Sequence, residues 1–390
     1  QDVWSKIASR FLETMKNRGF ELLADFQARC FEKIFKHLVD LESRLKGLVI
    51  SAGTGTGKTL SFFGPLLLYS MLEKTTTCSP GVKAICIYPR IKLAENQLES
   101  FIKSLYEVNS YVSSPDKKLT IGIDYTGTPW SRISFTNRPE EGMLFENGVR
   151  RLWKYNESLD AYICPYAKCP KCGSDLILPR KANYSKYVPL KCSSQNCDVK
   201  IDFVLYCKED LMKKPPDFLI TTTETLHRRL FDAKFQSLFG TEDYPPPKLI
   251  MIDEIHLHTS LKGTQVALLL RRLLQRLKMA VEYSNESLGE PIVLGLSATI
   301  SHQKEFFHEL TGISENQIEV EGPSDEDYLE ESGVEYFIFV KPETAENVTV
   351  LSNLIQTCMC VLHNMPQPRK FPDVNYKALG FVDSLDLVQR

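Results

Sequence analysis

The sequence predicts an α/β fold in which helices cover both faces of a parallel β-sheet. Several short runs rich in Val and Ile lack the polar alternation of half-exposed strands, which is typical of strands buried on both faces. These runs are residues 48–52, 82–88, 119–125, 218–221, 249–252 and 292–296. Helical patterns, for example residues 94–108 and 267–277, separate several of them. Such alternation indicates a doubly wound sheet, whose ligands bind beside the carboxyl ends of the strands.

Composition excludes several classes of protein. The chain is 43% hydrophobic and 25% charged, which is typical of a folded globular protein and not of a disordered one. Its 47 basic and 49 acidic side chains give a net charge of −2. This balance excludes a surface that is basic throughout, as in histones, but it allows a local row of basic residues that binds phosphates. No apolar run approaches the ~20 residues of a membrane span. We therefore expect a cytoplasmic protein with no membrane partner.

One long region interrupts the strand and helix alternation. Residues 130–214 lack a clean repeat and contain a cysteine cluster, so we expect an insertion between residues 1–129 and 215–365 of the α/β domain. The pattern then resumes, with a helix at 302–310, a strand at 334–340 and a helix near 348–364. Residues 366–390 carry three prolines and a new buried-type strand, which predicts a linker and the truncated start of a second domain. Because the chain opens on Gln1 and stops within this unit, we expect a fragment of a longer protein.

A phosphate-binding loop follows the first strand. Residues 48–52 lead into Ala52-Gly53-Thr54-Gly55-Thr56-Gly57-Lys58-Thr59, and a helical pattern comes next. The glycines let backbone N–H groups point at phosphate oxygens in front of a helix N-terminus. Lys58 can reach the β- and γ-phosphates, and the Thr59 hydroxyl can ligate Mg²⁺. The strict signature has glycine where this chain has Ala52, and a flexible Gly/Thr loop is the alternative. We predict that residues 53–59 bind the phosphates of a nucleoside triphosphate.

An acidic pair follows the strand at 249–252, in the segment Asp253-Glu254-Ile255-His256. This position puts both carboxylates at the same sheet edge as the phosphate loop. Asp253 can hold Mg²⁺ through water, and Glu254 can orient and deprotonate the attacking water. Acidic residues are common at strand ends, so the prediction depends on the combination with Lys58. Together these residues predict a Mg²⁺-dependent nucleoside triphosphatase.

These two segments resemble motifs I and II of the superfamily 2 DExD/H-box helicases, with the DExH form in motif II. Shorter segments resemble further motifs in the family's order: Gly19-Phe20 with Gln27 (Q motif), Tyr88-Pro89-Arg90 (Ia), Thr126-Gly127-Thr128 (Ib), residues 220–226 (Ic), Ser297-Ala298-Thr299 (III) and residues 380–384 (IV). The resemblance implies a RecA-like P-loop NTPase domain with a parallel sheet, followed by the start of a second RecA-like domain. It also implies ATP and Mg²⁺ as cofactors.

The resemblance further implies roles for single residues. Phe20 and Gln27 would bind adenine, and His256 would couple the ATP site to motif III, formed by Ser297, Ala298 and Thr299. The residues that would contact nucleic-acid phosphates are Pro89, Arg90, Gly127, Thr128, Thr222 and Thr223. More ordinary roles stay open: a surface glutamine for Gln27, a satisfied buried histidine for His256, and plain turn chemistry for the Thr and Gly residues.

Six of the eleven cysteines lie between residues 164 and 207. In a reducing compartment such a cluster indicates metal more often than disulfides. Two knuckles, Cys169 with Cys172 and Cys192 with Cys197, supply the four thiolates of a closed, structural Zn²⁺ site in a zinc-ribbon-like subdomain. An iron–sulfur cluster is the rival, and Cys164 or Cys207 could replace a ligand. Basic residues surround the cysteines in the sequence, with Tyr166, Tyr184 and Tyr187 between them. These residues could bind nucleic acid, or they could form an ordinary solvated face.

We therefore expect an ATP-dependent helicase or translocase that acts on single-stranded or partly duplex DNA. The inserted cysteine ribbon resembles that of large helicases in bacterial phage defence, whose other subunits would then be partners. Three alternatives stay open: an RNA helicase, a duplex translocase, and a non-hydrolysing nucleic-acid-binding scaffold. Motifs V and VI do not occur in the 390 residues. We expect them beyond Arg390, and we expect the chain as written to be a weak or inactive ATP hydrolase.

Overall fold

The computed structural model describes residues 3–40, 44–53, 56–77, 79–283, 289–298, 300–324 and 350–364. It divides into two compact units, residues 1–328 and 329–390. The second unit is described only by helix α9 (Val350–Asn364), which agrees with the helix expected near 348–364. Three predicted site residues, Thr54, Gly55 and Thr299, lie outside the described residues. So do the strand expected at 334–340 and the whole of 366–390, including motif IV.

An eight-stranded parallel sheet is the centre of the first unit. Its order is β10-β3-β11-β2-β12-β13-β1-β14, and every neighbouring pair is parallel. The strands are β1 (Gly47–Ser51), β2 (Ala84–Tyr88), β3 (Ile121–Asp124), β10 (Val204–Leu205), β11 (Phe218–Thr222), β12 (Leu249–Ile252), β13 (Ile292–Ser297) and β14 (Ile318–Glu321). The six predicted strands correspond to β1, β2, β3, β11, β12 and β13, whose residues are all buried, which confirms the α/β fold class with a parallel sheet.

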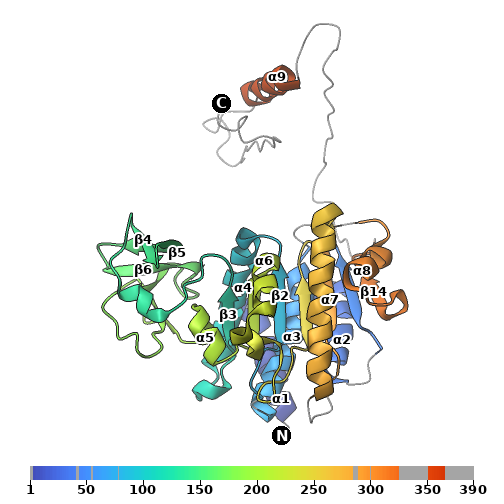
Figure 1. Ribbon diagram of the computed structural model, residues 1–390, viewed down its shortest axis with the longest axis horizontal. Helices are drawn as coiled ribbons and strands as arrows, with labels where there is room; N and C mark the ends of the chain where they lie inside the picture. The colour runs from blue at the N-terminus through green and yellow to red at the C-terminus, as the bar shows by residue number, and fades with distance from the viewer. Residues whose placement is uncertain are drawn as a thin grey trace. The chain divides into compact units, whose positions relative to one another are not determined.

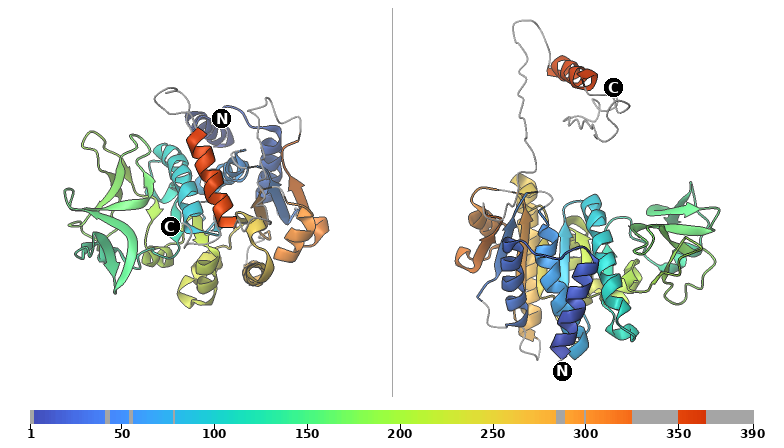
Figure 2. Two further views of the ribbon diagram at one scale, coloured as in Figure 1. Left: turned by 90° about the horizontal axis from the view of Figure 1, so that it is seen from above. Right: turned by 180° about the vertical axis from the view of Figure 1, so that it is seen from behind.

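Helices cover both faces of this sheet (Figures 1 and 2). One apolar core joins the sheet to α1 (Val3–Asn17), α2 (Asp25–Val39), α3 (Lys58–Thr76) and α4 (Ile91–Ser110). A second core joins the opposite face to α5 (Lys208–Lys213), α6 (Thr223–Phe231), α7 (Ser260–Tyr283) and α8 (Gln303–Thr311). Strand side chains alternate between the two cores, with Leu48 and Ile50 in the first and Val49 in the second. Short 3-10 helices span Pro115–Lys117, Arg132–Thr136, Ala233–Phe239, Ile255–Leu257 and Glu315–Gln317.

The region that interrupts the α/β pattern forms a second, antiparallel sheet of six strands in the order β4-β5-β6-β7-β8-β9. These are β4 (Met143–Glu146), β5 (Val149–Asn156), β6 (Ala161–Lys168), β7 (Asp175–Pro179), β8 (Leu190–Cys192) and β9 (Lys200–Ile201). It lies to one side of the main sheet (Figure 1). Phe135, Trp153 and Tyr206 form a fully buried aromatic cluster beneath it. The domain boundaries drawn from the sequence stay a prediction.

A search of the described residues for a helix that could cross a lipid bilayer found none of sufficient length and apolar character.

Candidate active site at the carboxyl edge of the main sheet

The motif residues gather at one edge of the main sheet, because the parallel strands that precede them all end there. Register pairing places Ser51 of β1 beside Ser297 of β13, and Ile252 of β12 beside Gly295 of the same strand. The phosphate loop, the acidic pair and the segment at 297–299 therefore leave adjacent strands β1, β12 and β13. On the other side of β12, strands β2, β11 and β3 lead in the same way into the segments that resemble motifs Ia, Ic and Ib.

Lys58 begins α3, directly after Gly57, and its ammonium group joins two strands. It donates to the Ala52 carbonyl oxygen at 2.8 Å and to the Ser297 carbonyl oxygen at 3.1 Å. Gly57 has a φ of 79°, and a Cβ there would lie 2.5 Å from the Gln27 amide nitrogen, so this position needs glycine. The loop thus holds the lysine at the sheet edge, between the phosphate loop and motif III.

Gln27 is buried against the phosphate loop. Its Nε2 donates to the Thr56 carbonyl at 3.0 Å, and its Oε1 accepts from the Ala24 backbone N–H at 3.0 Å as part of the cap of α2. The side chain is 8% exposed, so the alternative of a surface glutamine is wrong. Phe20 is exposed, at 38%. The contact of these two residues with adenine stays a prediction.

Thr59 and the acidic pair complete the phosphate end of the site. The Thr59 hydroxyl donates to Gln97 Oε1 on α4 at 3.0 Å, which leaves its oxygen lone pairs for a metal ligand. Burial raises the pKa of Asp253 to about 6, the neighbouring Glu254 adds to the rise, and the Lys58 ammonium opposes it. Lys58 and Asp253 therefore share one electrostatic environment. Glu254 lies in the left-handed region with a φ of 49°.

His256 links the acidic segment to motif III. Its Nδ1 lies 3.2 Å from Glu254 Oε2 and 3.2 Å from the Ser297 hydroxyl oxygen. The same ring nitrogen thus contacts both the acidic segment and motif III. Ala298 follows Ser297 at the end of β13. These contacts suit a coupling role, which stays a prediction.

The predicted nucleic-acid contacts differ in their exposure. Arg90 is exposed at the start of α4, and Pro89 and Thr223 are partly exposed. Thr222 is buried, and its hydroxyl accepts from the Thr225 backbone N–H at 3.4 Å as the N-cap of α6. Arg90 and Thr223 are therefore the side chains of this set best placed to meet a ligand.

Thr128 does not offer its hydroxyl to a ligand. Its side chain is fully buried, and the hydroxyl oxygen accepts from the Tyr125 backbone N–H at 3.2 Å within its own turn. Gly127 has a φ of 97°, and a Cβ there would lie 2.7 Å from Leu152 Cγ of β5. Both residues shape the turn that packs on the second sheet. The expected phosphate contact of the Thr128 hydroxyl is therefore wrong, and turn chemistry explains the residue.

One segment of the chain matches a known protein family. Residues 24–125, which include the phosphate loop and the segment that resembles motif Ia, match the family model of the DEAD/DEAH box helicases. This segment is thus similar to the DEAD/DEAH box helicases. The identity of motif II, Asp253-Glu254-Ile255-His256, specifies the DExH form.

The helicase domain also has curated relatives. The chain is 26% identical over 329 residues to Druantia protein DruE of Escherichia coli strain UMEA 4076-1, a match over 75% of this chain and 17% of DruE. It is 36% identical over 93 residues to ATP-dependent helicase Lhr-Core of Methanocaldococcus jannaschii, over 24% of this chain and 9% of that protein. The chain thus spans less than a quarter of the length of either relative. A crystal structure of DUF1998 helicase MrfA bound to DNA matches with 18% identity and a TM-score of 0.46, over 80% of this chain and 29% of that one.

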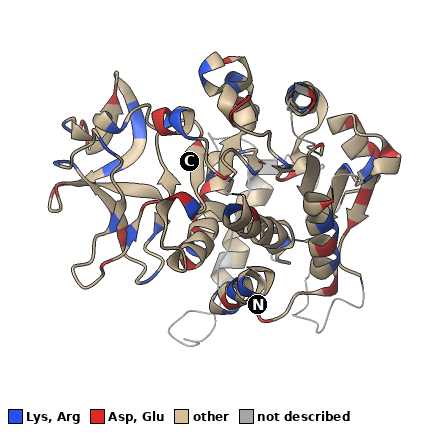
Figure 3. Cartoon of the chain, turned by 90° about the horizontal axis from the view of Figure 1, so that it is seen from below, with Lys and Arg blue, Asp and Glu red and all other residues tan. Residues whose placement is uncertain are grey.

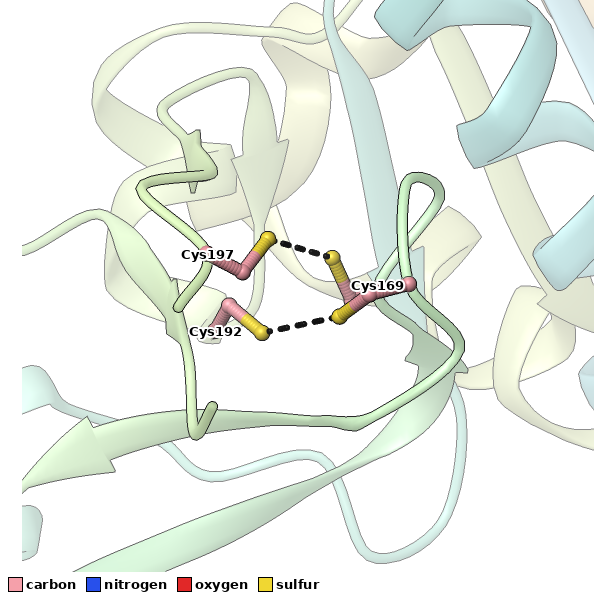
Figure 4. A group of neighbouring side chains, drawn as sticks. Cys169, Cys192 and Cys197 are labelled. Carbon is pink, nitrogen blue, oxygen red and sulfur yellow. Dashed lines mark hydrogen bonds between the residues drawn. The ribbon is translucent and has the colours of Figure 1, made fainter. Parts of the chain in front are cut away.

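The predicted cysteine set comes together beside the helicase domain. The four Sγ atoms of Cys169, Cys172, Cys192 and Cys197 lie within 4.8 Å of one another, and Figure 4 shows the thiols turned toward each other. Cys169 and Cys197 are 3.7 Å apart, and Cys172 and Cys192 are 3.4 Å apart. Zinc–sulfur bonds of 2.3 Å in a tetrahedron require sulfur atoms about 3.8 Å apart, so the set fits Zn²⁺.

The two spare cysteines lie elsewhere. Cys164 is buried, and the Cys207 thiol donates to Asp210 Oδ2 at 3.0 Å, so neither belongs to the four-thiol group. Gly173 has a φ of 74° and turns the first knuckle between β6 and β7. The second knuckle lies between β8 and β9. The replacement of a ligand by Cys164 or Cys207 is therefore wrong.

The basic surface expected around the cysteines is less distinctive than its sequence suggests. Tyr166 and Tyr184 are 1% and 4% exposed, so they belong to the core and cannot stack on bases. The Tyr187 hydroxyl donates to the Val204 carbonyl at 2.7 Å. Neighbouring cations are paired with carboxylates: Lys168 with Asp175, Lys171 with Asp198, and Arg180 and Lys181 with Asp160. Basic and acidic residues are mixed over this sheet (Figure 3). Tyr166 and Tyr184 therefore cannot contribute to a stacking surface, and both interpretations of the basic residues stay predictions.

Two groups near the site were missed by sequence reasoning. Gln303 of α8 donates from Nε2 to the Ser51 hydroxyl at 2.8 Å, at the start of the phosphate loop. A second group of cations, which includes Arg151 and Lys208, lies near the turn that follows β3. No sequence motif marks either group, because the residues of each group come from segments that are distant in the sequence and meet only in the folded chain.

Proposed function

We propose that this chain binds Mg-ATP at the carboxyl edge of its main sheet and couples ATP hydrolysis to movement along a nucleic-acid strand, with DNA as the substrate. One observation carries the proposal. Lys58 follows β1 and Asp253 follows β12, and these two strands flank β13 at one sheet edge, where residues that share one metal-bound triphosphate would lie.

The residues at this edge suit ATP and Mg²⁺. Thr59 and Asp253 offer a hydroxyl and a carboxylate, which are the oxygen ligands that Mg²⁺ prefers. Bound Mg²⁺ would neutralise charge on the phosphates. Lys58 would exchange the Ala52 and Ser297 carbonyls for phosphate oxygens. Since Ser297 belongs to motif III, this exchange would change the contact between the nucleotide site and the β13 segment.

Glu254 would act on the attacking water, and His256 would connect the nucleotide site to motif III. The Glu254 carboxylate would orient the attacking water and accept its proton. His256 contacts both Glu254 and Ser297, so it would transmit the state of the nucleotide site to motif III. Arg90 and Thr223, farther along the same edge, would hold strand phosphates without reading base sequence.

Three further parts of the proposal concern partners and place. We propose that the four-thiol group holds a structural Zn²⁺, because it has no open ligand position. The resemblance of the inserted cysteine ribbon to that of large phage-defence helicases supports DNA as the substrate, and a role in phage defence beside other subunits. The described cysteines form no disulfide, which supports a cytoplasmic location.

The test is ATP turnover by the full-length protein, measured with and without single-stranded DNA or RNA. We expect stimulation by DNA, and a loss of at least about a hundredfold in Lys58→Ala and Glu254→Gln, because each removes a group that acts on the phosphates or the water. Lys103→Ala is the matched control, since Lys103 is a surface residue of α4 paired with Glu99. Stimulation by RNA alone would favour the RNA helicase. Nucleic-acid-dependent function that survives in both variants would favour the scaffold.

A further inference from the structure

A small cavity lies where the second sheet meets the carboxyl edge of the main sheet. Its volume is about 210 Å³, and it lies beside the ends of β3 and β11. The residues that matter in its lining are Thr126, Gly127, Arg151, Lys208, Arg228 and Arg229. Thr126 and Gly127 lie in the turn after β3, and Arg228 and Arg229 lie on α6. Arg151 and Lys208 lie on β5 and α5, in the region that contains the second sheet. Four of these six side chains are cationic.

Three of the four cations are already neutralised. Arg229 pairs with Asp124 at 2.6 Å, Arg151 pairs with Glu146 at 2.7 Å, and Arg228 pairs with Glu224 at 2.6 Å. Lys208 differs. Within the described part of the chain its ammonium group has no carboxylate at ion-pair distance and no hydrogen-bond acceptor. The cavity therefore has one uncompensated cation.

The surroundings of Lys208 destabilise the charged form of its ammonium group. Burial lowers the pKa of Lys208, and Arg229 and Arg151 lower it further, while Asp124 and Glu146 oppose them. A partly buried ammonium beside two guanidinium groups gains more than an exposed one from an anion that enters the cavity. Such an anion would also meet Arg151 and Arg229, whose N–H groups exceed the number of bonds that their carboxylates take.

The cavity is held in a fixed shape. The Lys208 backbone N–H donates to the Pro129 carbonyl at 3.0 Å, just after the turn at 126–128. Glu146, which holds Arg151, also accepts from the Trp130 and Ser131 backbone N–H groups at 2.7 and 2.9 Å. The two sheets are thus joined around the cavity, and Arg151 and Arg229 are held by buried or nearly buried partners, whereas Arg228 is exposed.

Size and place identify the anion. Liquid water takes roughly 30 Å³ per molecule, so the cavity has room for a phosphate group but not for a nucleotide base and sugar together. It opens on the same sheet edge as Arg90 and Thr223. A phosphodiester of a strand that runs along this edge is the phosphate that would arrive there.

We propose that Lys208 binds one backbone phosphate of the nucleic-acid strand in this cavity, and that the region of the second sheet is therefore part of the nucleic-acid interface. This inference rests on the proposed function, because it takes a nucleic-acid strand as the ligand. It gives the region of the second sheet a role in nucleic-acid binding that does not depend on the lysines and tyrosines around its cysteines.

The test is binding of fluorescent oligothymidylate and oligouridylate to the full-length protein, measured by anisotropy at several salt concentrations. We expect Lys208→Ala to bind about tenfold more weakly, since a charge-assisted hydrogen bond contributes ~1.5 kcal/mol or more. The slope of log affinity against log salt should fall by about 0.7, the value for one lost phosphate contact with a single strand. Lys208→Arg should keep the wild-type slope. Lys213→Ala, on the same helix but paired with Glu209, is the matched control.

Equal affinity and equal slope in Lys208→Ala, Lys213→Ala and wild type would overturn the inference. If Lys208→Ala fails to fold, Lys208→Gln carries the same comparison, because it removes the charge with a smaller loss of side-chain length. A measurement of ATP turnover separates the two proposals, because stimulation by saturating DNA in the Lys208 variants would leave the proposed function standing. A wild-type protein that binds neither oligonucleotide would overturn both.

Discussion

Lys58 and Asp253 are 195 residues apart in the sequence, yet each could be placed from its own local pattern. Lys58 follows β1 through the phosphate loop, and Asp253 directly follows β12. Both strands are short and fully buried, and the carboxyl ends of parallel strands share an edge. Thr128 and Tyr166 could not be placed in this way. Their residue types suit ligand contact, but packing against the second sheet buries them, and burial depends on neighbours that are distant in the sequence.

Two ion pairs at the end of the β3 and β11 strands offer a test at the scale of single residues. Arg229 and Asp124 are buried and joined at 2.6 and 2.9 Å, whereas Arg228 and Glu224 are exposed and joined by one contact. We expect Asp124→Ala to lower the free energy of unfolding by about 3–5 kcal/mol, because it leaves a buried guanidinium without its partner. Glu224→Ala is the control and should cost about 1 kcal/mol or less. Urea denaturation measures both, and similar losses in the two variants would contradict this explanation.

At the scale of elements, the sequence predicted the strands whose burial is uniform and missed those whose burial is partial. The six central strands are continuous apolar runs. In contrast, β14 is an edge strand with one fully buried residue of four, and β10 has two residues. The strands of the second sheet mix buried and partly exposed residues, as in β5 and in β7, where burial alternates, so they do not produce long apolar runs. The cysteine knuckles were predictable, because their spacing is local.

The two knuckles predict a metal site that can be measured directly. We expect one Zn²⁺ per chain in the purified protein, and its loss in Cys172→Ser and Cys197→Ser, because three thiolates bind the ion far more weakly than four. Cys358→Ser is the control, since Cys358 is an exposed residue of α9. Elemental analysis gives the metal content. Iron with acid-labile sulfide in place of zinc, or zinc that persists in both knuckle variants, would show that the site is assigned wrongly.

At the scale of the whole molecule, the order of strands explains why one edge can serve both the nucleotide and the nucleic acid. The strands β1, β13 and β12 bring together the phosphate loop, motif III and motif II, and β2, β11 and β3 continue the same edge toward the second sheet. A change at Lys58 reaches Ser297 through one hydrogen bond. The cavity around Lys208 could not be predicted, since it depends on how the second sheet packs against the turn after β3.

The central claim is that Lys58 and Asp253 hold the same Mg-nucleotide, and titration with a fluorescent ATP analogue, with and without Mg²⁺, tests it most directly. We expect Mg²⁺ to tighten binding in the wild type. In Asp253→Asn the metal-free affinity should persist while the effect of Mg²⁺ disappears, and Lys58→Ala should weaken binding by tenfold or more in both conditions, about 1.4 kcal/mol or more. An undiminished Mg²⁺ effect in Asp253→Asn, or unchanged affinity in Lys58→Ala, would contradict the account.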